Sequence, residues 1–359
     1  MDGAGPGCNK RPIMVGSLRQ RLHPIIPSDL RDPVGLVVRI LRSGGADGRF
    51  AILGAGLKVL AMPLDRVLAP AEARLRRDCN APHRPVLIVT GPPRSGTTIV
   101  EQALLISLDV AYITNLMCLL PHAPIVAQRA LGGSFVDRRL PLASCYGRTR
   151  SFHGPNDGLD LWDGWLGVGR TELPDRIAAA ELRAFFGALQ QTFDRPVVTK
   201  NNPLMGYAHL VAEALPTARF VCLRRHPLYL AQSMLMARRV LHGDTGLPYG
   251  IDDPDHRPVA PVDPIRDVCR QVAFFQRLER QQAERIGPDR FRVIDYEGFC
   301  AAPAATVRTL GRELLGLDAD TGRLDQLGRL PTSQRRTLPV AEFARLEQEL
   351  ARLNQLEAA

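Results

Sequence analysis

Short apolar runs alternate with longer amphipathic segments along most of this chain. Four runs rich in β-branched or aromatic residues predict buried strands, at residues 86–90, 196–199, 219–223 and 291–295. Helical periodicity predicts helices at residues 97–108, 175–193, 207–215, 228–241, 264–286 and 304–315, and a last amphipathic helix near residues 340–353. Strands that alternate with helices at this spacing predict an α/β fold with a central parallel sheet covered by helices on both faces.

The distribution of turn residues divides the chain into two parts. Residues 1–82 form a predicted helical N-terminal extension, and residues 83–359 form the predicted α/β domain. Two stretches interrupt the domain: an insertion at residues 121–172, rich in Gly, Pro and aromatic residues, and a lid loop at residues 242–264. Long loops of this kind are usually functional, so we expect both to shape a site.

The most apolar stretch of the extension lies at residues 50–69. Lys58, Pro63 and Asp65 interrupt it, so it is too broken to be a membrane-spanning helix. We expect a helix that packs against the main domain. The alternative is a peripheral helix that lies on a membrane surface, because arginines flank the stretch on both sides.

The segment between the first predicted strand and its helix reads Gly91-Pro-Pro-Arg-Ser-Gly-Thr-Thr98. Backbone N–H groups of such a loop, together with the helix N-terminus, form a cradle for phosphate-like anions. Gly91 and Gly96 have the spacing of a nucleotide triphosphatase loop, but Thr97 stands where that loop has its lysine, and Arg94 supplies the positive charge instead. We therefore expect a phosphate-binding loop that is not tuned for γ-phosphate transfer. The alternative is a plain strand–helix connection.

The segment PRSGTT resembles the 5′-phosphosulfate loop of sulfotransferases that use 3′-phosphoadenosine 5′-phosphosulfate (PAPS), in their bacterial and Golgi tyrosylprotein branches. A second resemblance is Arg225 after the third predicted strand with Ser233 further along the next helix, and two more lie at residues 198–203 and 294–316. The resemblance covers about residues 86–316 and implies a P-loop-like α/β fold. It implies a donor site built from the following residues: Pro93, Arg94, Ser95, Gly96, Thr97, Thr98, Arg225 and Ser233.

The resemblance also implies the reaction, which is sulfuryl transfer from PAPS to an acceptor hydroxyl or amine, with adenosine 3′,5′-bisphosphate as product and no metal. Lys200 is our candidate for the cation that stabilises the leaving group. It is one of only three lysines in a chain with 46 Lys and Arg, and it ends a predicted strand, where open α/β sheets bind ligands. The alternative is a surface lysine that begins a turn.

The general base is harder to assign from the sequence. The tyrosylprotein branch has a glutamate shortly after the first helix, but residues 111–115 contain no carboxylate here. His153 and Asp157, in the insertion, are the candidates, and His122 is a reserve. We expect Glu101 to make a surface or capping contact. A separate expectation is that Trp162 and Trp165, three residues apart, form a packing face.

Composition and charge narrow the possible partners. The chain has 359 residues and a net charge of +9, which favours an anionic partner. The sequence contains no helix-turn-helix, zinc or RNA-binding signature, so we do not expect this partner to be nucleic acid. The seven cysteines form no C-x-x-C pair, and the N-terminus lacks a signal-peptide pattern, so we expect a cytoplasmic protein, with membrane association through residues 50–69 as the alternative. The acceptor is expected to be a small molecule, glycan or lipid, and the oligomeric state is not indicated.

A P-loop kinase or NTPase with a degenerate loop is the alternative function. Such an enzyme needs an aspartate after a second strand to bind Mg²⁺. Neither the strand that ends near Lys200 nor the one that ends near Arg225 is followed by such an aspartate.

Overall fold

The computed structural model describes residues 37–38, 45–132, 149, 151–243, 245–255, 262–332 and 334–358. Its helices and strands, in chain order, are α3 (Gly45–Arg77), β1 (Val86–Thr90), α4 (Thr97–Ser107), α5 (Asn115–Leu119), α6 (Pro124–Ala127), η1 (Gln128–Gly132), α7 (Leu159–Leu166), α8 (Ala179–Phe193), β2 (Val197–Lys200), η2 (Asn202–Gly206), α9 (Ala208–Ala214), β3 (Ala218–Arg224), α10 (Pro227–Leu241), α11 (Pro264–Ile286), β4 (Phe291–Asp295), α12 (Tyr296–Ala301), α13 (Pro303–Leu310), η3 (Gly311–Leu315), α14 (Thr321–Leu327) and α15 (Val340–Ala358).

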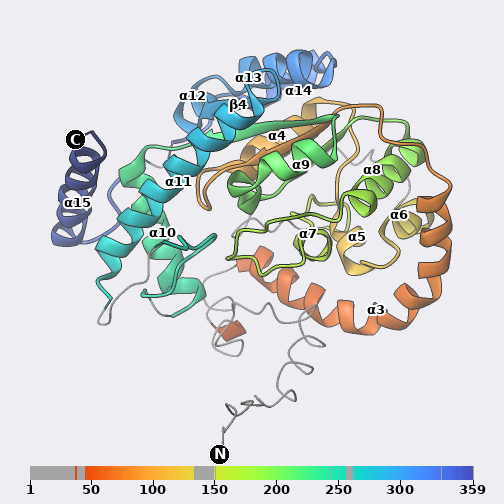
Figure 1. Ribbon diagram of the computed structural model, residues 1–359, viewed down its shortest axis with the longest axis horizontal. Coiled ribbons are helices and arrows are strands. Elements are labelled where there is room, and N and C mark those ends of the chain that lie inside the picture. Colours follow the sequence, from red (N-terminus) through yellow and green to blue (C-terminus); the bar gives the residue numbers. More distant parts are fainter. Residues whose placement is uncertain are drawn as a thin grey trace, which may run out of the picture.

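The four strands form one parallel sheet in the order β2-β1-β3-β4, which confirms the predicted α/β class (Figure 1). The two central strands, β1 and β3, are the most apolar, and every residue of β1 is buried. This agrees with the rule that strands covered on both faces read as continuous hydrophobic runs. The sheet order could not be read from the sequence, because the runs carry no pairing information.

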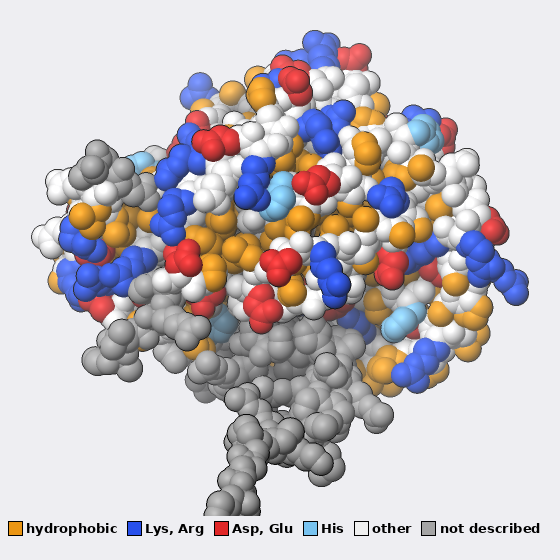
Figure 2. Space-filling view, in the orientation of Figure 1, with side chains coloured by type: hydrophobic (Ala, Val, Ile, Leu, Met, Phe, Trp, Pro, Cys, Tyr) orange, Lys and Arg blue, Asp and Glu red, His pale blue; other side chains and the backbone are white. Residues whose placement is uncertain are grey.

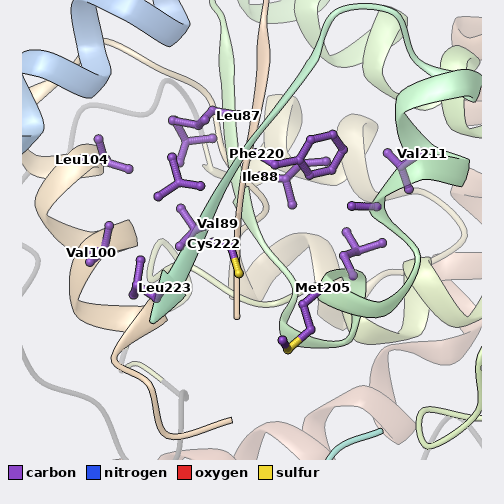
Figure 3. Close-up of a cluster of buried hydrophobic side chains, with 14 of the residues drawn as sticks. Leu87, Ile88, Val89, Val100, Leu104, Met205, Val211, Phe220, Cys222 and Leu223 are labelled. Atoms are coloured by element: carbon purple, nitrogen blue, oxygen red, sulfur yellow. The ribbon is translucent and has the colours of Figure 1, made fainter. Parts of the chain in front are cut away.

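Alternate residues of β1 and β3 point to opposite layers of helices. In Figure 3, Leu87, Val89 and Leu223 face Val100 and Leu104 of α4, while Ile88 and Phe220 face the side of the sheet that carries Val211 and Met205. This is the period-two alternation of a pleated strand. It creates a hydrophobic core on each face, while the parallel pairing of the strands places the carboxyl ends of β1, β2 and β3 together.

The helix bounds differ from prediction in one place that matters for the insertion. The predicted helix over residues 175–193 begins only at Ala179, since the residues before it are not helical. The backbone N–H of Ala178 donates to the carbonyl of Trp165, a bond that ties this irregular segment to α7. Trp162 and Trp165 are buried among Phe185 and Phe186, so they form the packing face that the sequence predicted.

The long helix α3 curves along the outer edge of the molecule, where it packs against α5, α6 and α8 (Figure 1). The prediction that residues 50–69 form a helix against the main domain is therefore confirmed. Pro63 and Pro70 lie inside α3, and interior prolines are a recognised cause of helix bending. Among the described residues, no helix is both long enough and apolar enough to cross a membrane.

Candidate active site

The glycine loop after β1 has a backbone that only glycine accommodates at two points. Gly91 and Gly96 have φ angles of 140° and 101°, both in the region that side chains disfavour. A Cβ on Gly91 would lie 2.7 Å from the carbonyl oxygen of Leu223, and a Cβ on Gly96 would overlap the Tyr296 ring. The loop is thus wedged between the ends of β1 and β3 and the start of α12.

This loop opens directly onto the N-terminus of α4. Gly96 is the N-cap and has no side chain, so it provides no acceptor for the backbone N–H groups of the first turn of α4. Ser95 is fully buried, and its hydroxyl oxygen has no hydrogen-bond partner among the described residues. A phosphate-like group bound at the loop would supply acceptors for such donors. The residues present therefore fit the anionic end of a phosphosulfate donor.

The structure brings the two predicted donor motifs into contact. Arg94 donates from Nε to the hydroxyl oxygen of Ser233 at 3.2 Å, and Arg225 donates from Nη1 to the carbonyl oxygen of Arg94 at 2.6 Å. The Arg225 guanidinium also lies over the Tyr296 ring, 5.0 Å from its centroid. Burial lowers the pKa of Arg225, the direction expected for a cation with little hydration. Two arginines, 131 positions apart in sequence, thus converge beside the glycine loop.

Two neighbouring segments border the same place. A Cβ on Gly250 would lie 2.6 Å from Cγ of Pro93, so the described part of the lid loop packs directly on the glycine loop. The C-terminal segment approaches α10, where Gln232, next to Ser233, donates to the carbonyl oxygen of Arg335 at 3.0 Å. Arg335 itself is exposed.

Lys200 is buried at the carboxyl end of β2 and forms an ion pair with Asp157, so two of the predicted catalytic residues are in direct contact. The contact itself does not test whether Lys200 stabilises the leaving group or whether Asp157 is the base. Lys200 is paired with Val89 across the sheet, close to where the glycine loop begins. The lysine side chain is 2% exposed and that of Asp157 is 24% exposed, so the pair extends from the interior toward solvent. It can present a cation and a carboxylate to the same reacting centre.

The residues after Lys200 fix its position relative to the loop. Asn201 donates from its backbone N–H to the carbonyl oxygen of Val89 at 3.0 Å. Asn202 accepts a hydrogen bond from the Thr97 hydroxyl at 2.9 Å through its side chain, and one from the Thr90 hydroxyl at 3.1 Å through its backbone. Thr97, at the position of the missing lysine, therefore holds the start of η2, just after β2, to α4. Thr98 is half-buried in the first turn of the same helix.

The segment that carries Asp157 is held by the stretch where the tyrosylprotein branch has its glutamate. Asn156 donates to the side-chain oxygen of Asn115 at 2.7 Å, and its backbone N–H donates to Ile113 at 2.9 Å. Asn115 in turn donates to the carbonyl oxygen of Ser151 at 2.8 Å. These bonds link residues far apart in sequence, so Asp157 is positioned by tertiary contacts and not by a local motif.

His153 lies in the same segment, but the hydrogen bonds that the structure gives it are made by its backbone. Its carbonyl oxygen accepts from the Tyr112 hydroxyl at 2.9 Å, and its N–H donates to Ser151 Oγ at 3.2 Å. His122, the reserve candidate, pairs through Nδ1 with Asp65 of α3 at 2.6 Å. Its partner therefore belongs to α3 and not to the glycine loop. Of these three candidates, Asp157 is the one that contacts Lys200.

Glu101 is a residue whose environment the sequence reading missed. The expectation of a surface or capping contact is wrong, because Glu101 is only 1% exposed, and one of its carboxylate oxygens has no hydrogen-bond partner among the described residues. Burial raises the pKa of Glu101 to about 8; the Lys200 ammonium opposes the rise and the Asp157 carboxylate adds to it. The apolar residues of α4 at positions 99, 100 and 103–106 favoured a buried helix, but Glu101 and Gln102 are polar, so the sequence alone did not predict that these two positions are buried.

The described ranges contain no group of three or more His, Cys, Asp or Glu side chains that could hold a metal ion.

The comparisons with known proteins show the family of the chain. A model of the sulfotransferase family matches residues 85–320, and the chain belongs to that family. Similar solved structures include the sulfotransferase STF9 from Mycobacterium avium, with 16% identity, a TM-score of 0.49, and coverage of 97% of this chain and 90% of that one. Another is the sulfotransferase STF1 from Mycobacterium tuberculosis H37Rv, with 14% identity, a TM-score of 0.47, and coverage of 88% and 90%. None of the curated proteins compared matches the chain.

The family assignment makes the chain a transferase and does not favour the kinase alternative. Thr97 in the lysine position agrees with this, since its hydroxyl is engaged by Asn202. Figure 2 shows basic and acidic side chains interspersed over one face, with no continuous basic stripe among the described residues on that face. The positive net charge is therefore not gathered there as it is on a nucleic-acid-binding surface.

Proposed function

We propose that this sulfotransferase uses PAPS as its donor and transfers the sulfuryl group to a hydroxyl or amine of a small molecule, glycan or lipid. The observation that carries the proposal is the convergence of Arg94, Arg225 and Ser233 beside the glycine loop. A nucleotide with phosphate groups at both the 5′ and 3′ positions needs two anion sites close together, and this arrangement supplies them.

The loop residues have distinct roles in this proposal. Arg94, Ser95, Gly96, Thr97 and Thr98 bind the 5′ end of the donor through backbone N–H groups, hydroxyls and the Arg94 guanidinium, and Pro93, which has no backbone N–H, contacts the donor through its ring. Arg225 and Ser233 bind the 3′-phosphate. The donor supplies an activated sulfuryl group whose departure leaves negative charge on a phosphate oxygen.

Lys200 and Asp157 then divide the chemistry between them. The Lys200 ammonium stabilises the charge that develops on the leaving oxygen, and the Asp157 carboxylate accepts the proton of the acceptor hydroxyl. Because Lys200 is almost completely buried, its charge acts in a poorly hydrated environment, where electrostatic stabilisation is strong. His153 stays a second candidate for the base.

Thermal-shift titration of the full chain tests this proposal. Adenosine 3′,5′-bisphosphate without Mg²⁺ should stabilise the protein by about 2.7 kcal/mol at a hundredfold excess over its dissociation constant. Stabilisation by ATP–Mg²⁺ and not by the bisphosphate would reject the donor assignment. Mass spectrometry of candidate acceptors incubated with donor, in search of an added sulfo group, would then identify the acceptor class.

The proposed setting of the reaction is the cytoplasm, as the scattered cysteines suggest. Contact with a membrane surface through residues 50–69 is a separate expectation, and it depends on which side chains of α3 face solvent.

A further inference from the structure

The outer side of α3 exposes large apolar side chains in a regular pattern. Leu53, Leu60, Leu64 and Val67 are 59%, 77%, 46% and 74% exposed, although the same helix packs against α5, α6 and α8 on its inner side. Their spacing of seven, four and three residues places them on one face of an α-helix. We call these four residues the α3 apolar face. Figure 2 shows hydrophobic and basic side chains along the lower right edge, where α3 runs in Figure 1.

The inner side of α3 accounts for the acidic side chains that the structure describes on this helix. Asp65 is buried and accepts hydrogen bonds from the backbone N–H groups of His122 and Ala123 at 2.9 and 3.1 Å. Glu72 is buried and accepts from those of Ile125 and Val126 at 3.1 and 3.0 Å. Both carboxylates therefore serve to dock the insertion on α3 and contribute little to the outer surface.

The outer surface of α3 is left with basic charge. Arg49, Arg66, Arg74 and Arg77 are exposed, and they lie before, within and after the α3 apolar face. Lys58, the other basic residue near the middle, points inward and pairs with Asp160. An apolar strip bordered by arginines, with its described carboxylates turned inward, is the composition of a helix that binds an anionic membrane surface.

We propose that the α3 apolar face docks on an anionic lipid bilayer, with its leucines and valine in the headgroup–acyl boundary and the flanking arginines among the lipid phosphates. The helix is already folded and fixed to the domain by its inner side, so binding orders no new backbone. A second copy of the chain is a poorer occupant, since a symmetric pair would place the same arginines side by side. This inference does not depend on the donor or on the chemistry.

Vesicle co-sedimentation of the full chain tests the proposal. We expect binding to vesicles of equal parts phosphatidylcholine and phosphatidylglycerol, and much weaker binding to phosphatidylcholine alone. The pair Leu60→Asn and Val67→Asn should reduce the partition coefficient by about tenfold or more, because each side chain would lose its burial in lipid. The pair Arg66→Gln and Arg74→Gln should also reduce it about tenfold, and added salt should weaken wild-type binding.

A matched control is available on α15. Leu356 and Val340 are 63% and 62% exposed, so the Leu356→Asn and Val340→Asn pair removes the same two residue types at similar exposure. This pair should leave vesicle binding unchanged, and circular dichroism should show all variants folded. The proposal is overturned if the wild-type chain does not bind anionic vesicles, or if the α3 and α15 pairs weaken binding equally. It is also overturned if sedimentation velocity shows a dimer that only the α3 pair abolishes.

Discussion

Replacing Lys200 by methionine removes one buried charge while keeping most of the side-chain volume. Lys200 is 1% exposed and pairs with Asp157, so the variant loses the cation proposed to face the leaving oxygen. Removal of one preorganised charge or donor of this kind typically costs about 2.7–4 kcal/mol of transition-state stabilisation. We therefore expect turnover to fall by about 100- to 1,000-fold, while donor affinity changes by less than about tenfold.

The loss of the ion pair itself must be separated from this effect. Breaking a fully buried ion pair costs about 3–5 kcal/mol of stability. Breaking the Lys200–Asp157 pair should cost less, because the Asp157 side chain that is left without its partner is 24% exposed to water. Lys58→Met is the control, because Lys58 also pairs with an aspartate, Asp160, although Lys58 is 13% exposed and Asp160 has a second partner in Arg170. It should lower stability by less than Lys200→Met and leave turnover per folded molecule unchanged.

The assay follows formation of adenosine 3′,5′-bisphosphate with an acceptor found by the screen, and donor affinity is measured by calorimetry on the same samples. If Lys200→Met retains turnover within a few-fold of wild type, Lys200 does not stabilise the leaving group. An equal loss of turnover in both lysine variants would show that the effect is structural.

Three further predictions follow from the described contacts. Because the pKa of Glu101 rises to about 8 on folding, from an unperturbed value of 4.5, the folded chain binds the extra proton between these pH values, and its stability falls as pH rises through that window. In urea unfolding, Glu101→Gln should remove this dependence of stability on pH. Relative to wild type, the variant should gain a few kcal/mol of stability on going from pH 5 to pH 9. An unchanged pH dependence would contradict the raised pKa of Glu101. Gly91→Ala should destabilise the chain by about 1–3 kcal/mol, since the added Cβ would meet the backbone of Leu223 at a positive φ, and wild-type stability would show that the loop relaxes. Asp157→Asn should lower turnover per folded molecule by about 100-fold or more, whereas retained turnover would transfer the role of base to another group such as His153.

The strands and the glycine loop were predictable because their signals are local. The run at residues 86–90 is apolar and β-branched, and the structure places β1 at those residues. The loop that follows needs glycine at positions 91 and 96, where φ is positive and a Cβ would meet neighbouring atoms, and the spacing of the two glycines in the motif already predicts this loop. The order of the strands was not predictable, because apolar runs buried on both faces do not record their neighbours.

The candidate site was predictable only in part. Arg225 directly follows β3 and Ser233 lies in α10, the next helix, so the approach of both residues to the glycine loop could be expected from the topology. The contact between Lys200 and Asp157 could not, because it joins residues 43 positions apart through a segment held by Asn115 and Asn156. The burial of Glu101 depends on the packing of α4 between the sheet and α13 and α14, which only the tertiary structure supplies.

The requirement for a 3′-phosphate gives the most direct test of the proposed donor. Calorimetry should compare adenosine 3′,5′-bisphosphate with adenosine 5′-monophosphate on the wild-type chain and on Arg225→Ala, without Mg²⁺. Charge-assisted hydrogen bonds contribute about 1.5–3 kcal/mol each, so the bisphosphate should bind wild type about 100-fold more tightly, and Arg225→Ala should remove most of that difference. Equal affinity of the two nucleotides for the wild-type chain would contradict the assignment of PAPS as donor.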